Sequence, residues 1–213
     1  MSYENLGRLP DPTTVPAGPG FVSQQLTDNT PGMMHNLNQG GSISVKFSGS
    51  FWTIDIGYPQ LTISEANTII PFLYSLQGGF TNFYVQLPTH ANPQTGAWGA
   101  TGILVADVSK GTKTNQVNIT NWSLRGAGNE LSAGDFIKFS ESNKIYMIVA
   151  TDLVGDTMIL DLNADVIGSL ATSTIEPNDI KFRVRLRSKT PTLSLNADGL
   201  YESFTLNLRE NIL

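Results

Sequence analysis

Groups capable of acid–base catalysis or metal binding are few in this sequence, and they are not spaced as such chemistry needs. The two histidines, His35 and His90, lie in Asn-rich, turn-like stretches, and neither has another histidine at ligand spacing. The chain has no cysteine, which excludes thiolate nucleophiles, disulfides and cysteine-based zinc sites. We therefore interpret both histidines as loop residues that are solvated or locally hydrogen bonded.

One acidic run matches the start of a calcium-binding loop. Asp161, Asn163 and Asp165 give the pattern D-x-N-x-D. That loop needs glycine at its sixth position and glutamate at its twelfth, where this chain has Val166 and Thr172. The pattern therefore excludes an EF-hand. The signatures of serine hydrolases, zinc proteases, P-loop nucleotidases and dinucleotide-binding folds are absent too, so we expect no metal and no cofactor.

Glu130 and Asp135 are carboxylates that could form a glycosidase pair, but their context does not favour this chemistry. Glycosidic hydrolysis needs two carboxylates that flank the scissile bond. Gly134 and Asp135 come directly before the strand-like run FIKF, and a Gly-Asp pair is typical of a turn. We therefore interpret Asp135 as a turn residue and expect that the chain is not an enzyme.

Five cationic residues occupy every second position of one strand-like run. Alternate residues of a strand lie on one face, so the pattern predicts a positively charged stripe. Such a stripe fits an acidic protein partner; the low density of other cations makes it a poorer fit to nucleic acid. An alternative is a solvated edge strand whose like charges prevent edge-to-edge aggregation. The five residues of this candidate protein interface are Lys181, Arg183, Arg185, Arg187 and Lys189.

The clearest structural signal in the chain is a single amphipathic helix. Thr62 and Glu65 form the capping box T-x-x-E that begins it, and Gly78 with Gly79 can adopt the left-handed conformation that ends it. Pro71 lacks an N–H group and predicts a kink, or a break into two short turns. We expect the helix to brace a β-sheet through its apolar stripe. This stripe consists of Ala66, Ile69, Ile70, Leu73 and Leu76.

Alternating strand patterns dominate the rest of the chain. They flank the helix at 51–58 and 83–87, recur between turns over 103–187, and return at 200–208. The sequence therefore predicts a mainly β fold with one amphipathic helix. The order of the patterns suggests that the last strand completes the first β unit, and that the middle β region is inserted between the two halves.

This order predicts three parts. The first is a proline-rich arm at 1–20, which is extended or flexible. The second is a discontinuous β domain made of 21–95 and 190–213. The third is a small β-sandwich or barrel inserted at 96–189.

Composition limits where the chain acts. The net charge is −5 and only 15% of residues are charged, against about 25% in typical domains, which argues against a general nucleic-acid binder. No stretch approaches the roughly 20 apolar residues of a membrane span, so we expect no membrane insertion. The N-terminal sequence MSYENLGRLPDPTT lacks the basic start and apolar run of a secretory signal. We therefore expect a protein that is made and used without secretion by that route.

Short motifs between Trp52 and Pro88 resemble tail proteins of double-stranded DNA bacteriophages. They read W, a short strand, YP-x-LT, a helix ending in FL-x-SL-x-G, then F and LP. The resemblance continues in the middle region and near the C-terminus, at Leu131, Gly134-Asp135, Ile145-Tyr146, Tyr201, Phe204, Leu208 and Glu210. By analogy with distal tail and baseplate hub proteins, it implies a tail-tube-like β domain arranged in a ring, usually six-fold. The inserted domain would then project outward to hold neighbouring baseplate components.

The resemblance also implies a location and partners. It makes the chain a structural protein of the virion tail or baseplate, assembled in the host cytoplasm, with copies of itself and other tail proteins as partners. DNA would be present only as contents passing through the lumen. An alternative is a carbohydrate- or receptor-binding β module of a tail, in which Trp98, Trp122 and Tyr146 would be stacking platforms. Core or interface positions are the simpler interpretation of these aromatic residues.

Overall fold

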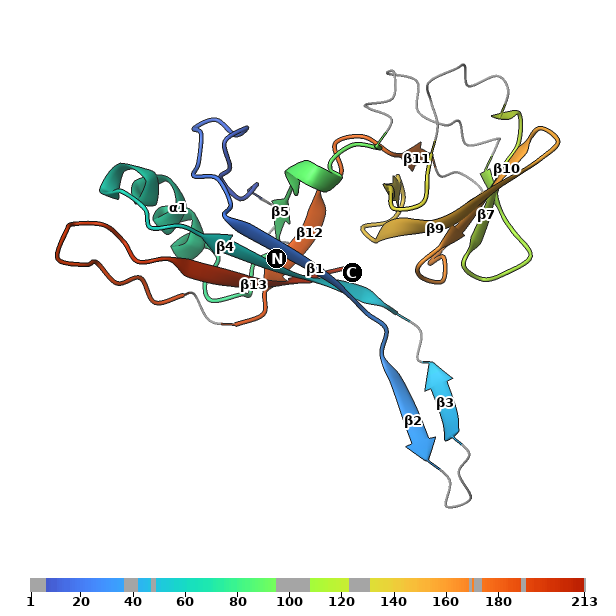
Figure 1. The fold of residues 1–213 in the computed structure, drawn as a ribbon, viewed down its shortest axis with the longest axis horizontal. Helices are drawn as coiled ribbons and strands as arrows, with labels where there is room; N and C mark the ends of the chain where they lie inside the picture. The colour runs from blue at the N-terminus through green and yellow to red at the C-terminus, as the bar shows by residue number, and fades with distance from the viewer. Residues whose placement is uncertain are drawn as a thin grey trace. The chain divides into compact units, whose positions relative to one another are not determined.

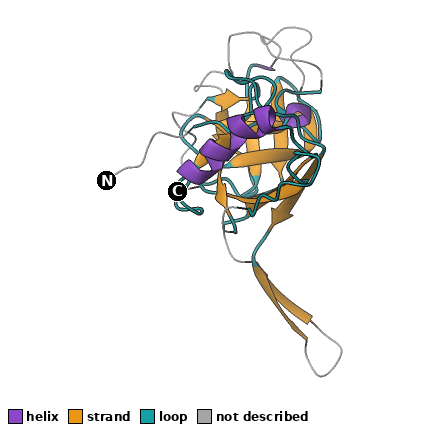
Figure 2. Cartoon of the chain, turned by 90° about the vertical axis from the view of Figure 1, so that its left-hand side faces the viewer, coloured by secondary structure: helices purple, strands orange, loops and turns teal. Residues whose placement is uncertain are grey.

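The chain folds into a mainly β structure with one helix, as the sequence predicts (Figures 1 and 2). The computed structural model describes residues 7–36, 42–46, 49–94, 108–122, 131–168, 170, 174–188 and 191–212. It divides into two compact units. The first unit contains Met1–Thr27, Trp52–Leu87 and Lys181–Leu213, and the second contains Asp28–Phe51 and Pro88–Ile180.

A five-stranded sheet is the framework of the first unit. In spatial order its strands are β1 (Ser23–Asn29), β4 (Phe51–Tyr58), β13 (Phe204–Glu210), β12 (Phe182–Leu186) and β5 (Phe83–Val85). β13 is antiparallel to both of its neighbours, and Leu208 lies opposite Ile54 on one side and Leu186 on the other. All three side chains are buried. The C-terminal strand therefore joins segments that are far apart in the sequence.

β12 lies in this five-stranded sheet, whereas the sequence predicts residues 181–189 as the end of the inserted domain. Phe182, Val184 and Leu186 of β12 are buried, and the residues opposite them on β13 and β5 are buried as well. When one face of a sheet is buried, neighbouring strands must turn their apolar side chains to that same face. β12 does so with both β13 and β5. Strand periodicity by itself does not say which sheet a strand joins.

The helix α1 (Ile63–Ser75) forms as its capping signals predict. The Thr62 side chain accepts a hydrogen bond from the Glu65 backbone N–H at 3.3 Å, and the Glu65 carboxylate accepts one from the Thr62 backbone N–H at 2.9 Å. These two bonds satisfy N–H groups that the first helical turn leaves without partners. Ala66, Ile69 and Leu73 are buried on one side of the helix. This burial fits the predicted role of α1 as a brace for the sheet.

Of the two outcomes predicted at Pro71, the break into two short turns is wrong, because α1 is one continuous helix, and the kink stays a prediction. Pro71 removes the hydrogen bond that would reach the carbonyl of Asn67. Both residues are exposed, so water can bind that carbonyl. α1 ends at Ser75 with Leu76 as its C-cap. The first residue with positive φ after the cap is Gln77, not one of the predicted glycines, and Gly78 and Gly79 follow it with positive φ.

Replacing Thr62 with alanine should lower the free energy of unfolding by about 1 kcal/mol at neutral pH, because the helix loses its cap. The hydrogen bonds from Thr62, first from its backbone and then from its side chain, lower the pKa of Glu65 from its ordinary value of 4.5. A lowered carboxylate pKa contributes stability above the unfolded value and loses it as the pH falls through the folded value. Thr62→Ala keeps the backbone donor and removes only the side-chain bond to Glu65, so only that part of the penalty should be lost at acidic pH. Urea unfolding at several pH values tests this; Ser64→Ala, an exposed first-turn change, is the matched control and should cost nothing comparable.

The second unit contains a six-stranded sheet. In spatial order its strands are β11 (Ile175–Glu176), β8 (Phe136–Phe139), β9 (Ile145–Val154), β10 (Thr157–Leu162), β7 (Gln116–Ile119) and β6 (Val108–Lys110). β9 and β10 form a hairpin closed by Gly155 and Asp156, and Gly155 has a φ of 63° that a tight hairpin turn favours. A short 3-10 helix, η1 (Pro88–His90), also lies in this unit.

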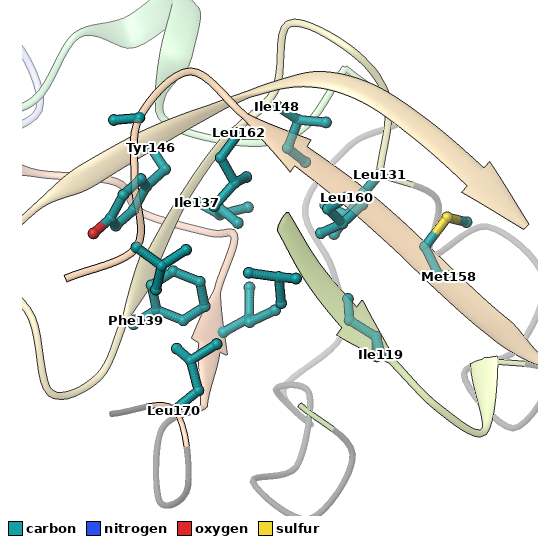
Figure 3. Packing of buried hydrophobic residues seen from close by; sticks show 14 residues of the cluster. Ile119, Leu131, Ile137, Phe139, Tyr146, Ile148, Met158, Leu160, Leu162 and Leu170 are labelled. Carbon is teal, nitrogen blue, oxygen red and sulfur yellow. The ribbon is translucent and has the colours of Figure 1, made fainter. Parts of the chain in front are cut away.

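One hydrophobic cluster forms the core of the second unit. Figure 3 shows Ile137 and Phe139 of β8, Tyr146 and Ile148 of β9 and Leu160 of β10 gathered in it. Phe139 and Tyr146 meet edge to face, with ring centroids 5.4 Å apart. Burial alternates along β7 and β10, as expected for strands with one face in a core.

A separate two-stranded sheet consists of β2 (Gly32–Asn36) and β3 (Ser42–Lys46). The sequence predicts strands in this region only in general terms. Met33 and Val45 lie directly opposite each other and are 54% and 51% exposed. A hairpin of two strands gains little stability from so exposed an apolar pair.

The structure describes the proline-rich N-terminal segment from Gly7 onward, and this part contacts β5. Leu9 is fully buried, and its backbone N–H donates to the carbonyl of Tyr84 on β5 at 2.8 Å. The Tyr84 N–H in turn donates to the carbonyl of Gly7 at 3.0 Å, so this segment pairs in parallel with β5. Arg8 forms an ion pair with the nearly buried Asp11 at 2.7 Å. Residues 7–9 thus extend the five-stranded sheet beyond β5.

Candidate protein-interaction face

The cationic stripe predicted from the sequence lies on one face of β12. Phe182, Val184 and Leu186 point to the buried face, so the residues between them lie on the opposite face. Arg185 and Arg187 are exposed, while Lys181 and Arg183 are half-buried. Lys189, the fifth predicted residue, lies outside the described residues.

The explanation of the stripe as an edge strand is wrong. β12 has β13 on one side and β5 on the other, so both of its backbone edges are paired. Cations on such a strand are not needed to block edge-to-edge aggregation. Their charge therefore calls for another explanation.

A fourth arginine, which the sequence did not single out, lies on the same face. Arg209 of β13 lies directly opposite Arg185 of β12. Residues directly opposite in an antiparallel pair have Cα atoms roughly 4.5–5.5 Å apart, and like charges placed so are destabilising. We call Arg183, Arg185, Arg187 and Arg209 the arginine face. The polar alternation of β13 places Arg209 outward, but only the register shows that it meets Arg185.

The arginine face is bounded by a polar row with a carboxylate. Asn207 of β13 donates from its side-chain amide to Asp55 of β4 at 2.7 Å, and both are half-buried. Asn207 also accepts, through its backbone carbonyl, the N–H of Arg187 at 2.8 Å. Charge on this side of the sheet therefore changes from positive at β12 to negative at β4.

The other residues that could do chemistry are held in structural contacts. The ring of His90 packs 4.8 Å from that of Phe136, and burial lowers the pKa of this histidine below 6.5. The side chain of His35 lies outside the described residues. Within the ranges that the structure describes, no three His, Asp or Glu side chains are grouped to hold a metal ion.

The acidic run that resembles a calcium loop is used internally. Asp161 accepts hydrogen bonds from Gln116 at 2.9 Å and Lys113 at 3.1 Å, and these bonds lower its pKa. Asn163 accepts from the Met147 backbone N–H, and Asp165 accepts from a threonine hydroxyl. The three side chains therefore tie strand ends together.

The carboxylate pair considered for glycosidic chemistry is not supported. Asp135 is buried, and its carboxylate accepts the backbone N–H groups of Gln94 at 2.9 Å and Ser132 at 2.8 Å. Gly134, the residue before Asp135, has a φ of 98°. Gly134 and Asp135 therefore form the predicted turn into β8. Glu130 lies outside the described residues.

The aromatic residues considered as carbohydrate platforms are in the core where the structure describes them. Tyr146 is fully buried, and its hydroxyl accepts the N–H of Ile167 at 3.0 Å. Trp122 is partly buried against the core cluster of the second unit. Trp98 lies outside the described residues. No helix in the described ranges is long and apolar enough to span a membrane.

The chain is a mainly β protein whose five-stranded sheet is completed by its last strand, β13, and carries arginines on its outward face. Two family models match it: the N-terminal part of the A domain of distal tail protein pb9 over residues 9–90, and the B domain of the same protein over residues 97–180. Distal tail protein pb9 of Escherichia phage T5 is 32% identical over 214 residues, covering 96% of this chain and 100% of that protein. The chain belongs to the pb9 family of bacteriophage distal tail proteins, which makes it a structural component of a phage tail.

Proposed function

We propose that the chain is a subunit of a homo-oligomeric ring at the hub of the tail tube or baseplate. By the family resemblance the ring is six-fold. The inserted six-stranded β unit holds neighbouring tail components. The protein acts through its contacts and carries out no reaction. DNA meets it only while passing through the lumen, and assembly into the virion takes place in the host cytoplasm.

The difference between the two edges of the five-stranded sheet carries this proposal. β1, at one edge, pairs with β4 alone among the described strands, and most of its residues are exposed. The opposite edge strand, β5, is paired by residues 7–9 of the same chain. An open edge is a template for another strand. A closed ring needs two different surfaces that complement each other on successive subunits, and two unlike edges supply them.

Electron microscopy of purified protein and of phage particles tests the proposal, together with mass photometry of the purified protein. We expect rings of identical subunits, or assembly only in the presence of other tail proteins, and we expect the protein at the tail end of particles. A monomer that is absent from particles would overturn the proposal.

A further inference from the structure

We propose that the outer half of β9 is a docking edge that accepts an extended segment of another tail protein as an added strand. The inference rests on the proposed function and deepens it, because it names the strand of the six-stranded unit that holds a neighbouring component and the kind of segment that binds there. It starts from the burial of β9, whose residues 145–148 are mostly buried and whose residues 149–154 are all exposed.

The backbone of this outer half is paired on one side only. β8 lies beside β9 as far as Ile148. The N–H of Ile148 donates to the carbonyl of Asp135 at 2.9 Å, and its carbonyl accepts the N–H of Gly134 at 2.8 Å. Beyond this point no described residue pairs with the edge of β9 that faces away from β10. The edge is therefore open along the outer half of the strand.

The register of the hairpin shows which backbone groups face the open edge. The two-residue turn closes on Val154 and Thr157, which makes them a hydrogen-bonded pair. Every second residue of an antiparallel strand bonds to the same neighbour, so the N–H and carbonyl groups of Thr151 and Leu153 point away from β10. Each of these two residues offers one donor and one acceptor, and an added strand is the partner that satisfies both kinds of group.

The side chains of the open edge specify an amphipathic strand. Leu153 lies directly opposite Met158 of β10, and residues paired in this way share a face of the sheet. Met158 belongs to the core cluster in Figure 3 and is 9% exposed, whereas Leu153 is 53% exposed. An apolar residue of an added strand would cover Leu153 and extend the core. On the other face Asp152, the only charged residue of 149–154, favours a basic residue opposite it.

The two end strands of the same sheet have features that prevent such pairing. β11 at one end has two residues, and β6 at the other end has three and terminates in Lys110. Short edge strands and edge lysines block the addition of another strand. The outer half of β9 contains no lysine and exposes Val149, Leu153 and Val154. It therefore lacks the protection that the end strands have.

A second copy of this chain is a poorer occupant of the edge than another tail protein. Two β9 edges that pair with each other are related by a two-fold axis, whereas neighbours in the proposed ring are joined through unlike edges. β1, the open edge strand of the five-stranded sheet, reads SQQLTDN. It has one apolar residue and no basic one, so it does not match the amphipathic strand that the outer half of β9 specifies.

Crosslinking in assembled particles tests the inference. Because the chain contains no cysteine, Ala150→Cys gives one attachment point for a benzophenone crosslinker in the exposed half of β9. Full-length protein is supplied to a phage that lacks its own copy, and the products are mapped by mass spectrometry. We expect a product with one segment of another tail protein, in which apolar residues alternate with polar ones. Ser109→Cys, at an exposed position of β6, should give at most one-tenth of this product.

A proline at the open edge provides the second measurement, because it removes a backbone donor. In Thr151→Pro the lost N–H is one that points away from β10, so the hairpin should remain and the melting temperature should fall by no more than about 4 °C. Combined with Ala150→Cys, this change should reduce the crosslinked product at least tenfold. Thr151→Ala keeps the N–H and should reduce the product less than twofold. Leu153→Lys places a charge on the apolar face of the edge and should also reduce it at least tenfold.

Three results would overturn the inference. They are a product that the proline and alanine variants form equally well, a product with a second copy of this chain in place of another protein, and no product above the level of the Ser109→Cys control. The proposed function would survive each of them as long as the original chain forms rings in particles. Absence of the original chain from particles would instead overturn the proposed function.

Discussion

Replacing Leu208 with alanine should lower the free energy of unfolding by about 2–5 kcal/mol. Leu208 is fully buried at the centre of the five-stranded sheet, with Ile54 of β4 opposite on one side and Leu186 of β12 on the other. The change removes apolar contacts and leaves a cavity between three segments of the first unit. The change should therefore weaken the packing of β13 between β4 and β12.

Urea unfolding followed by circular dichroism measures this loss. Thr205→Ala is the matched control, because Thr205 lies on the same strand but is exposed, opposite Gly57. We expect a change within about 0.5 kcal/mol for the control. A Leu208→Ala variant as stable as the control would mean that β13 does not hold the first unit together.

The helix could be predicted from the sequence because its determinants are local. The capping box of Thr62 and Glu65 acts within a few residues and is present in the structure. The predicted glycine pair lies directly after the helix too, but Gln77 is the first residue with positive φ. The break at Pro71 was expected from a local rule, the missing N–H of proline in a helix interior. The helix nevertheless continues through this exposed position to Ser75.

Strand partners could not be predicted in the same way. The alternation of β12 predicts which of its side chains are buried, and the structure buries them. Alternation does not encode which strand lies alongside, because several strands of the chain share the same period of two. The placement of β12 beside β13 and β5, and of Arg209 opposite Arg185, depends on pairing across the sequence.

Short elements gave too weak a signal to predict. β11 has only two residues, and β2 reads GMMHN, in which no period can be recognised. Their pairing partners, β8 and β3, are what make them strands. A two-residue strand gains its stability from the sheet it joins and not from its own propensity.

In the candidate site, too, the local pattern could be predicted from the sequence and the strand pairing could not. The sequence predicts a cationic face on one strand, but the cost of that face becomes visible only when Arg209 is placed across from Arg185.

Replacing Gly79 with alanine should destabilise the protein by about 3 kcal/mol. Gly79 has a φ of 100°, which is strained for any residue with a Cβ atom. A Cβ atom there would lie 2.8 Å from the backbone oxygen of Leu186 at the end of β12. The backbone cannot move away without disturbing the strand that carries the arginine face, so strain and close contact add.

Gly78→Ala separates these two causes. Gly78 also has a positive φ, 70°, but a Cβ atom there would meet nothing within 4 Å. We expect about 1 kcal/mol for this change, from the backbone conformation alone. Urea unfolding of both variants gives the difference, which measures the cost of pushing the loop after α1 away from β12. Equal losses would contradict the close approach of Gly79 to Leu186, and with it the view that this glycine lets the helix end lie directly against the sheet.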